Sequence, residues 1–399
     1  MPTAHENDPW LGANPLDPAF RDDPYPALKR LRESQPVHQA PFGMWRLTRY
    51  DDIERLLREV RAGVRRSDGT RPGEESTGGS EFMLQQDPPD HTRLRKLVSK
   101  AFTPRAIERW RPRAEAIVEE LLDRVEAKGE LDVIADLALP VPSTLICEML
   151  GVPVEDRASF TVWTADATHG LAAQMSPPDV VERAAQAAEQ LEEYFEDLIQ
   201  SRRQEPREDL LSDLIRAEEA GDRLSRNELL SQSIGLLIAG FETTIGLIGN
   251  GVRALIRHPR ELEKLRRDPG LIESAVEECL RYDGPIPLTV RILHEDAEFA
   301  GVRVPKDAQV FAMLAAANRD PEVFQEPDRF DIERRDNRHL AFGGGTHFCL
   351  GTHLARLEAQ LAIGGLVRRL PGLELVNEKV EWGPSLFRVP GRLPVRFRS

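Results

Sequence analysis

The sequence predicts a mainly helical protein with small β-sheets, organised as one domain over residues 1–399. Apolar residues recur at the helical period over three long stretches, residues 114–127, 178–203 and 226–258. No internal repeat is visible, and the one low-complexity stretch, residues 65–80, is too short to link two domains. The length alone would allow more than one domain, so the missing linker favours a single large one.

Short strands are expected between the helices. Residues 44–48 predict a strand, which is followed by a predicted helix over residues 51–57. Residues 298–310 alternate between apolar and polar side chains, and Pro305-Lys306-Asp307 predicts the turn of a hairpin within them.

Two further helix starts are predicted from capping chemistry. Thr103-Pro104 and Asp320-Pro321 each place a side-chain oxygen before a proline. The oxygen can accept a hydrogen bond from the first turn of a helix, where proline is tolerated.

Composition excludes several classes of protein. With 53 Lys and Arg against 67 Asp and Glu, the net charge is −14, which argues against nucleic acid as a partner. Cys147, Cys279 and Cys349 are scattered, which argues against a disulfide framework and favours a reducing compartment. The first residues lack the pattern of a signal peptide, and the longest apolar stretch is interrupted by Glu242. We therefore expect a cytoplasmic monomer with no membrane partner.

Cys349 is the most informative single residue. It lies in the glycine-rich segment FGGGTHFCLG, residues 342–351, directly before a predicted helix over residues 354–361. Glycines allow a tight turn and leave room for a flat ligand, and the positive end of a following helix favours a thiolate. Such a thiolate is a metal ligand or a nucleophile. The loop by itself leaves open an inert buried cysteine and a catalytic pair with His347.

A second unusual segment interrupts an apolar helix. Within residues 233–248 the apolar run is broken by Glu242, Thr243 and Thr244. A buried carboxylate is costly unless it is paired, so Glu242 indicates a function. Gly240 permits a local widening of the helix. The alternative is a helix cap, or a Thr243 hydroxyl that bonds back to the carbonyl of Ala239.

Together the two segments resemble the cytochrome P-450 family, through its Phe-x-x-Gly-x-x-x-Cys-x-Gly loop and its Ala-Gly-x-Asp/Glu-Thr stretch. The resemblance covers nearly the whole chain, from about residue 23 onward. It implies the cytochrome P-450 fold, a triangular helical prism that encloses haem b, with Cys349 as the axial iron ligand. It also implies a soluble bacterial monooxygenase that inserts one oxygen atom from O₂ into a lipophilic small molecule, by hydroxylation or epoxidation.

The resemblance assigns roles to further residues. Thr243 and Glu242 would act in oxygen activation and proton relay. The two haem propionates, which need cationic or hydrogen-bonding partners, would be held by His91, Arg95, Arg291 and His347. The other haem contacts implied are Phe342, Gly351, Ala239 and Gly240.

Glu278 and Arg281 share one helical face and resemble the buried Glu-x-x-Arg pair of the family, with Arg329 as its third member. This trio would brace the cysteine loop. An ordinary surface ion pair is the alternative, and such pairs contribute only about 0.5 kcal/mol.

Substrate contacts are expected by family position and are mostly apolar, which suits a lipophilic molecule. Core packing is the alternative for each of them. Fatty acid, terpenoid, steroid and macrolide substrates all fit, and Arg388 either anchors a substrate carboxylate or faces solvent. The expected contacts are Phe82, Met83, Trp163, Leu171, Leu237, Phe241, Leu288, Thr289, Leu386 and Phe387.

Basic residues cluster between positions 91 and 113, where Glu108 is the only acid. In the family this stretch borders the cysteine side of the haem, so we expect a ferredoxin or flavodoxin, served by its NAD(P)H reductase, to dock there. A solvated helix face is the alternative. The basic residues are Arg93, Arg95, Lys96, Lys100, Arg105, Arg109, Arg111 and Arg113.

Three rival functions stay open for the protein as a whole. They are a peroxygenase on the same fold, a non-enzymatic haem-thiolate sensor and a Cys/His hydrolase.

Overall fold

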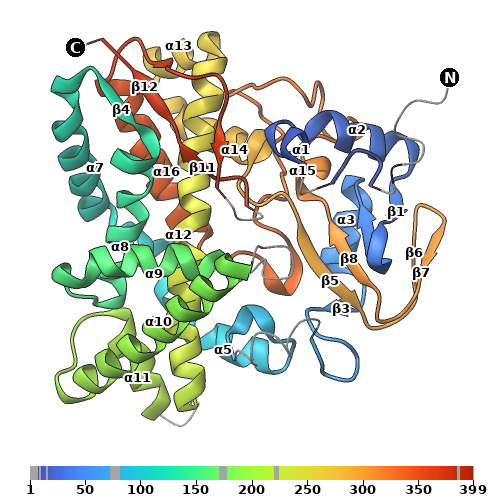
Figure 1. Cartoon of the computed structure of the whole chain (residues 1–399), viewed down its shortest axis with the longest axis horizontal. Helices are drawn as coiled ribbons and strands as arrows, with labels where there is room; N and C mark the ends of the chain where they lie inside the picture. Colours follow the sequence, from blue (N-terminus) through green and yellow to red (C-terminus); the bar gives the residue numbers. More distant parts are fainter. Residues whose placement is uncertain are drawn as a thin grey trace. The chain divides into compact units, whose positions relative to one another are not determined.

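The computed structural model describes residues 8, 10–14, 17–71, 81–169, 178–219, 224–383 and 387–398. These residues are mainly α-helical with small sheets, as predicted (Figure 1). Backbone contacts divide the chain into two compact units, each assembled from separate stretches. Unit 1 comprises Met1–Pro72, Asn250–Cys349 and Asn377–Gly391, and unit 2 comprises Gly73–Gly249, Leu350–Val376 and Arg392–Ser399. The single domain over residues 1–399 stays a prediction.

Unit 1 is built around a five-stranded sheet of order β1-β2-β8-β5-β3, in which only the β2–β8 pair is parallel. Leu47, Ile53 and Val310 belong to its core and are fully buried. The strands of this sheet are β1 (Val37–Gln39), β2 (Trp45–Leu47), β3 (Ala62–Gly63), β5 (Thr289–Leu293) and β8 (Gln309–Ala312). Its helices are α1 (Pro18–Asp22), α2 (Tyr25–Ser34), α3 (Tyr50–Arg58), α13 (Pro259–Arg267), α14 (Ile272–Asp283) and α15 (Leu314–Ala317). Two small sheets complete it, β6 (Ala297–Phe299) with β7 (Val302–Val304), and β10 (Glu381–Trp382) with β11 (Pro390–Arg392).

The short elements predicted in unit 1 are partly confirmed. β2 and α3 appear where a strand and a helix were expected. A hairpin forms between β6 and β7, but its turn is Ala300-Gly301, with φ angles of 45° and 79°, and not Pro305-Lys306-Asp307. A tight hairpin turn needs positive φ at both central residues, and the later segment leads into β8 instead.

The helix start predicted at Asp320-Pro321 is wrong, because only a turn follows. The Asp320 carboxylate accepts a hydrogen bond from the Glu322 N–H at 3.2 Å, as a cap would. It also accepts one from the Tyr50 N–H at 2.9 Å. The capping group therefore ties this turn to the start of α3.

Unit 2 is helical and carries one three-stranded antiparallel sheet, of order β4-β12-β9. The predicted long helices are confirmed as α7, α10 and α12, and the Thr103 hydroxyl caps α6 by accepting from the Ala106 N–H at 3.3 Å. The strands are β4 (Glu130–Asp132), β9 (Glu374–Leu375) and β12 (Pro394–Arg396). The helices are α5 (Asp90–Val98), α6 (Pro104–Glu108), α7 (Arg111–Val125), α8 (Pro140–Leu150), α9 (Arg157–His169), α10 (Pro178–Gln204), α11 (Leu210–Glu219), α12 (Arg226–Arg257) and α16 (Thr352–Arg369). The last turns of α12, from Asn250 onward, belong to unit 1.

The helix α12 is long and apolar enough to cross a membrane by length and composition alone. In the structure, 67% of its most apolar 18-residue window is buried inside the protein. Burial of this kind is what the core helix of a globular protein shows, since such a helix is apolar on most of its faces.

A buried carboxyl lies in the core of unit 2. Glu358 of α16 is 1% exposed, and neither of its oxygens has a hydrogen-bond partner within ordinary limits among the described residues. Burial raises the pKa of Glu358 to about 8, and interaction with the Thr244 hydroxyl of α12 lowers it only in part. The group is therefore largely protonated at neutral pH.

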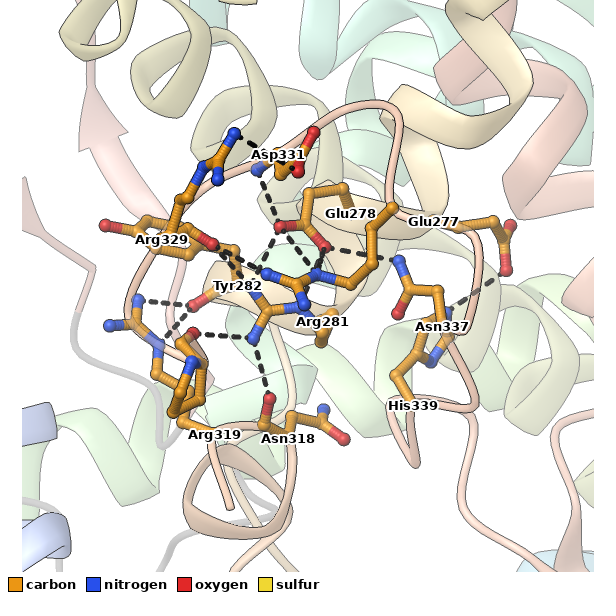
Figure 2. A network of polar contacts seen from close by, with 12 residues as sticks. Glu277, Glu278, Arg281, Tyr282, Asn318, Arg319, Arg329, Asp331, Asn337 and His339 are labelled. Atoms are coloured by element: carbon orange, nitrogen blue, oxygen red, sulfur yellow. Dashed lines mark hydrogen bonds and ion pairs between the residues drawn. The ribbon is translucent and has the colours of Figure 1, made fainter. Parts of the chain in front are cut away.

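A network of buried charges organises the irregular stretch of unit 1 that precedes Cys349 (Figure 2). The predicted Glu278–Arg281 pair is confirmed. Arg281 Nε lies 2.7 Å from Glu278 Oε2, and both side chains are 0% exposed. Arg281 Nη2 also donates to Glu278 Oε1 at 2.8 Å, and the other Arg281 N–H groups donate to the carbonyls of Asn318, Pro327 and Arg329 at 2.8–3.0 Å. One side chain thus fixes three separate points of the backbone.

The third member of the brace is Arg334, and the prediction of Arg329 is wrong. Arg334 Nε lies 3.2 Å from Glu278 Oε2, and its side chain is 10% exposed. The Arg329 side chain is 53% exposed and pairs with Glu326 and Asp331. The physical reason is that the Arg329 backbone carbonyl accepts N–H groups from both Arg281 and Arg334, so its side chain is directed to solvent.

The same network reaches the cysteine loop. Asn337 Nδ2 donates to Glu278 Oε2 at 3.2 Å, and His339 Nε2 lies 3.2 Å from Glu277 Oε2. The His339 ring packs against that of Phe342, the first residue of the loop, with 5.9 Å between ring centres. The brace therefore holds the chain up to the point where the loop begins.

Replacing Arg334 with Ala should destabilise the protein by about 1–3 kcal/mol, because a fully buried carboxylate loses a charged hydrogen-bond partner. Replacing Arg329 with Ala is the matched control and should change stability by less than about 0.5 kcal/mol. Chemical unfolding of the two variants measures the difference. Equal losses would show that Arg329, and not Arg334, completes the brace.

Replacing Glu358 with Gln should make the stability of the protein less dependent on pH. The pKa of Glu358 in the folded state, about 8, lies above its ordinary value of 4.5, so folding takes up a proton between these values. The native carboxyl is favourable for folding below about pH 4.5 and loses that contribution as the pH rises toward about 8. The melting temperature of the variant, relative to that of the native protein, should therefore increase as the pH rises from about 4.5 to about 8. The exposed Glu155, replaced in the same way, is the control, and parallel curves would contradict the burial argument.

Candidate functional site

The cysteine loop is closed by its own backbone. The Cys349 N–H donates to the Phe342 carbonyl at 3.0 Å, and the Gly343 N–H donates to the Leu340 carbonyl at 2.8 Å. A short 3₁₀ turn, η9 (Gly345–His347), lies inside the loop, and α16 begins shortly after Cys349. Cys349 forms no disulfide and is half-buried. The two hydrogen bonds therefore hold the backbone on either side of a half-buried thiol.

The glycines of the loop face α3. Gly343 and Gly345 have φ angles of 70° and 65°, which other residues rarely adopt. A Cβ at Gly345 would overlap the carbonyl oxygen of Leu57, and one at Gly344 would lie 3.3 Å from the Leu57 Cβ. The sequence predicted that these glycines leave room for a flat ligand. At Gly344 and Gly345, however, the last turn of α3 occupies the space that a side chain would need.

The other two cysteines behave differently from Cys349. Cys147 and Cys279 are both 2% exposed. Burial raises the pKa of Cys147 to about 12 and that of Cys279 further still. A thiol held in that way is inert, whereas Cys349 is within reach of a ligand. No group of three or more His, Cys, Asp or Glu side chains in the described part of the chain could hold a metal ion. A single cysteine thiolate is one of the donor sets by which a protein holds a haem iron.

The acid-alcohol segment lies in the middle of α12. The Thr243 hydroxyl donates to the Ala239 carbonyl at 3.0 Å, the back-bonded arrangement that was the alternative. The local widening that Gly240 permits is not seen, since α12 is assigned as α-helix across this position. Ala239 is exposed, and Gly240, Glu242 and Thr243 are half-buried, whereas Phe241 and Thr244 are buried. One face of the helix is thus open at the segment. The donating hydroxyl keeps its oxygen lone pairs for a second partner.

Glu358 is a site residue that the sequence analysis missed. Its neutral carboxyl faces Thr244, the residue directly after Thr243. The sequence carried no clear signal for it, because Glu358 lies in the mixed stretch Arg356-Leu357-Glu358-Ala359-Gln360. The structure therefore adds a second acid behind the acid-alcohol segment.

The four expected propionate partners are distributed over both units. His91 (buried) and Arg95 (half-buried) lie one turn apart on α5 of unit 2. Arg291 of β5 and the half-buried His347 belong to unit 1. Arg291 is 6% exposed and donates to the Thr289 hydroxyl at 3.2 Å and to the Val290 carbonyl at 2.8 Å. Their joint action on one ligand stays a prediction, as do the haem contacts of Phe342, Gly351, Ala239 and Gly240.

The expected substrate contacts have varied surroundings. Phe82, Met83, Leu237 and Phe241 are buried in unit 2. Trp163 of α9 packs against Phe160 and Tyr194, with 6.0 and 6.2 Å between ring centres. Leu288 packs against a small core cluster of unit 1, and Phe387 is half-buried. Leu171 and Leu386 lie outside the described residues. Contact with a substrate stays a prediction for the whole set.

Arg388 has an internal partner. It is 7% exposed, and its Nε lies 2.8 Å from Asp283 Oδ1. Burial by itself would raise the pKa of Asp283, but Arg388 and its other partners hold that pKa below the usual range. The carboxylate that Arg388 anchors is therefore one from the protein itself.

Part of the predicted basic cluster is neutralised. Arg93 pairs with Glu228, Arg113 with Glu148, and Arg111 with Glu108. Lys96, Lys100, Arg105 and Arg109 are exposed. The positive surface is smaller than the sequence suggests and is concentrated at the end of α5 and on α6.

Comparison with known proteins agrees with this arrangement. The family model of cytochrome P-450 matches residues 37–269 and 270–375. The chain is 42% identical over 390 residues to vitamin D(3) 25-hydroxylase of Pseudonocardia autotrophica, with 94% of each chain covered. It is similar to a P-450 crystallised with hexadec-9Z-enoic acid ligated acyl carrier protein, with a TM-score of 0.89, 40% identity and coverage of 95% and 100% of the two chains. It is also similar to a myxobacterial P-450 in complex with myristic acid, with a TM-score of 0.87, 42% identity and coverage of 96% and 98%.

Similarity of this extent, over a chain that carries the closed cysteine loop and the acid-alcohol helix, decides the family. It also implies a haem iron as cofactor and an oxygenase activity. The chain belongs to the cytochrome P-450 family.

Proposed function

We propose that the protein is a haem-thiolate monooxygenase that inserts one oxygen atom from O₂ into a lipophilic small molecule by hydroxylation or epoxidation, with haem b as its cofactor. The observation that carries this proposal is the half-buried Cys349 on a closed loop, in a chain whose other cysteines are buried. When bound, the haem supplies the activation of O₂. The chain supplies the iron ligand, proton delivery, substrate placement and exclusion of water.

Proton delivery is the role proposed for the acid-alcohol segment. Thr243 is held in one orientation by its hydrogen bond to the Ala239 carbonyl, on the open face of α12. Its hydroxyl oxygen can accept a proton-bearing partner while its own proton is engaged. Glu242 is half-buried and is the ionisable group next to it. Glu242 takes up protons, and the Thr243 hydroxyl passes them on by turning from the Ala239 carbonyl to donate its own proton while its oxygen accepts another.

The haem propionates are assigned to His91, Arg95, Arg291 and His347. Buried carboxylates require cationic or hydrogen-bonding partners, and these four residues offer ring and guanidinium N–H groups. Phe342, Gly351, Ala239 and Gly240 are assigned to contact with the ring, which needs small or apolar neighbours.

The substrate is lipophilic. The residues proposed to contact it are largely apolar, and the relatives described above are named for vitamin D(3) or were crystallised with a fatty acid or fatty acyl ligand. Placing such a molecule beside Thr243 requires an apolar surface on the same unit, which Leu237, Phe241, Phe82 and Met83 supply.

The electron donor proposed is a ferredoxin or flavodoxin with its NAD(P)H reductase. Lys96, Lys100, Arg105 and Arg109 are exposed. An exposed basic surface attracts an acidic redox protein and speeds its encounter. The proposed location is the cytoplasm, and the proposed state is a monomer.

The purified protein should bind haem through a thiolate. Its reduced carbonyl complex should show the long-wavelength Soret band that marks thiolate ligation, and Cys349→Ser should lose this band. Cys147→Ser, which alters a buried cysteine, should keep it. A colourless native protein, or an unchanged band in the Cys349 variant, would refute the proposed function.

Replacing Thr243 with Ala should uncouple the enzyme. Without the hydroxyl, Thr243 could no longer order proton delivery, so reductant would be consumed and peroxide released with product falling about tenfold or more. Thr243→Ser keeps the hydroxyl and should stay mostly coupled. The ratio of product to NAD(P)H consumed, with a ferredoxin as donor, measures the effect. Full coupling in the Ala variant would remove Thr243 from proton delivery.

A further inference from the structure

A buried glutamine of α12 binds the backbone of a distant segment of unit 2. Gln232 is 0% exposed. Its Nε2 donates to the Glu81 carbonyl at 2.9 Å, and its Oε1 accepts the Met83 N–H at 3.2 Å. One side-chain amide thus satisfies an acceptor and a donor on either side of Phe82. This arrangement fixes the backbone of Phe82 relative to α12.

The side chain of Phe82 lies against a glycine of the same helix. A Cβ added at Gly235 would overlap three carbons of the Phe82 ring. The ring is therefore in direct contact with the backbone of α12, and Phe82 is only 9% exposed. A glycine destabilises the interior of a helix, so its presence at position 235 is explained by this contact.

The beginning of α12 is tied to the same segment. Ser225 and Glu228 form a capping box, in which the Ser225 N–H donates to Glu228 Oε2 at 2.7 Å and the Glu228 N–H donates to Ser225 Oγ at 3.0 Å. The Ser225 hydroxyl also donates to Glu81 Oε2 at 3.1 Å. Arg93 of α5 donates to Glu228 Oε2 at 3.2 Å. Residues 81–83 are thus held at successive turns of the helix.

The distance along α12 relates this contact to the proposed chemistry. Gly235 and Thr243 are eight residues apart, which corresponds to about 12 Å along a helix axis. Gly235, Ala239 and Glu242 follow one another at the i, i+4 and i+7 positions, so they share one stripe of the helix. Phe82 therefore stands on the same stripe as the open face at Ala239.

We infer that Gln232 and Gly235 are positioning residues that hold Phe82 as the end wall of the substrate pocket, and so set the length of molecule that the enzyme accepts. This inference rests on the proposed monooxygenase function, which places the reacting atoms beside Thr243. A linear substrate that reacts there extends along the stripe until it meets the Phe82 ring. Gln232 fixes the backbone of the wall, and Gly235 fixes the depth at which its ring lies.

Alkylimidazoles with linear tails of increasing length measure how long a molecule the pocket accommodates before it meets the Phe82 ring. Their ring nitrogen binds the haem iron, which gives a Soret shift that does not depend on the natural substrate. In the native holoenzyme the affinity should rise with tail length and then stop rising at a definite length. In Phe82→Ala this limit should move to longer tails. Gln232→Leu lacks both hydrogen bonds, so the Phe82 ring is no longer held in one place. In this variant the affinity should level off gradually with tail length, with no sharp limit.

The contact between Gly235 and Phe82 is tested by a double-mutant cycle. Gly235→Ala should weaken binding of the best tail by about tenfold in the native background. It should have less than about a twofold effect in the Phe82→Ala background, where the overlapping ring is gone. Leu84→Ala is the matched control, because Leu84 lies in the same short turn with 53% of its side chain exposed. That variant should keep the native limit.

The outcomes separate the two proposals. A native protein with no thiolate-type carbonyl band and no Soret shift with any alkylimidazole would overturn the monooxygenase function itself. A normal band with the same length limit in the native, Phe82→Ala and Gln232→Leu proteins would overturn the wall alone. So would a native series with no length limit. Unfolding midpoints of Gly235→Ala with and without Phe82→Ala provide a second readout, in which the overlap predicts that the double variant is the more stable one.

Discussion

The buried ion pair between Glu278 and Arg281 is the interaction on which the conformation of the chain leading to the Cys349 loop depends. Removing two charges from water is expensive, and attraction between them compensates only when the remaining hydrogen-bonding capacity is also satisfied. Here Arg334, Asn337 and a backbone N–H complete the coordination of the carboxylate. Arg281 in turn holds three carbonyls of a stretch without regular structure. A polypeptide with few backbone ladders of its own thereby reaches the loop in a defined conformation.

Regular elements of this fold could be predicted from the sequence, and irregular ones could not. The helices α7, α10 and α12 repeat an apolar face over many turns, so their period is visible in the sequence. The hairpin turn at Ala300-Gly301 depends on two positive φ angles, and alanine gives no sign of one. Arg334 turns its guanidinium toward Glu278, whereas Arg329 turns its backbone carbonyl toward Arg281. In a stretch without periodicity, no sequence pattern shows which residue contributes its side chain to the network and which contributes its backbone carbonyl.

The site shows the same division. Cys349, Glu242 and Thr243 stand out because their chemistry conflicts with their neighbours in the chain. Gln232 and Glu358 gain their meaning from Glu81, Met83 and Thr244, which are distant in sequence. A polar side chain within a helix is ordinary until its partner is known. The sequence could therefore predict Cys349, Glu242 and Thr243 as candidate site residues, whereas the contacts of Gln232 and Glu358 required coordinates.

The contact of Gly345 with α3 also defines what could be moved to another scaffold. The loop from Phe342 to Cys349 closes through its own hydrogen bonds, yet its depth is set by the carbonyl of Leu57. A graft of the loop alone would leave that surface behind, and its glycines would then make it pliable. The smallest portable thiolate-presenting unit is consequently discontinuous. It consists of the loop together with the last turn of α3.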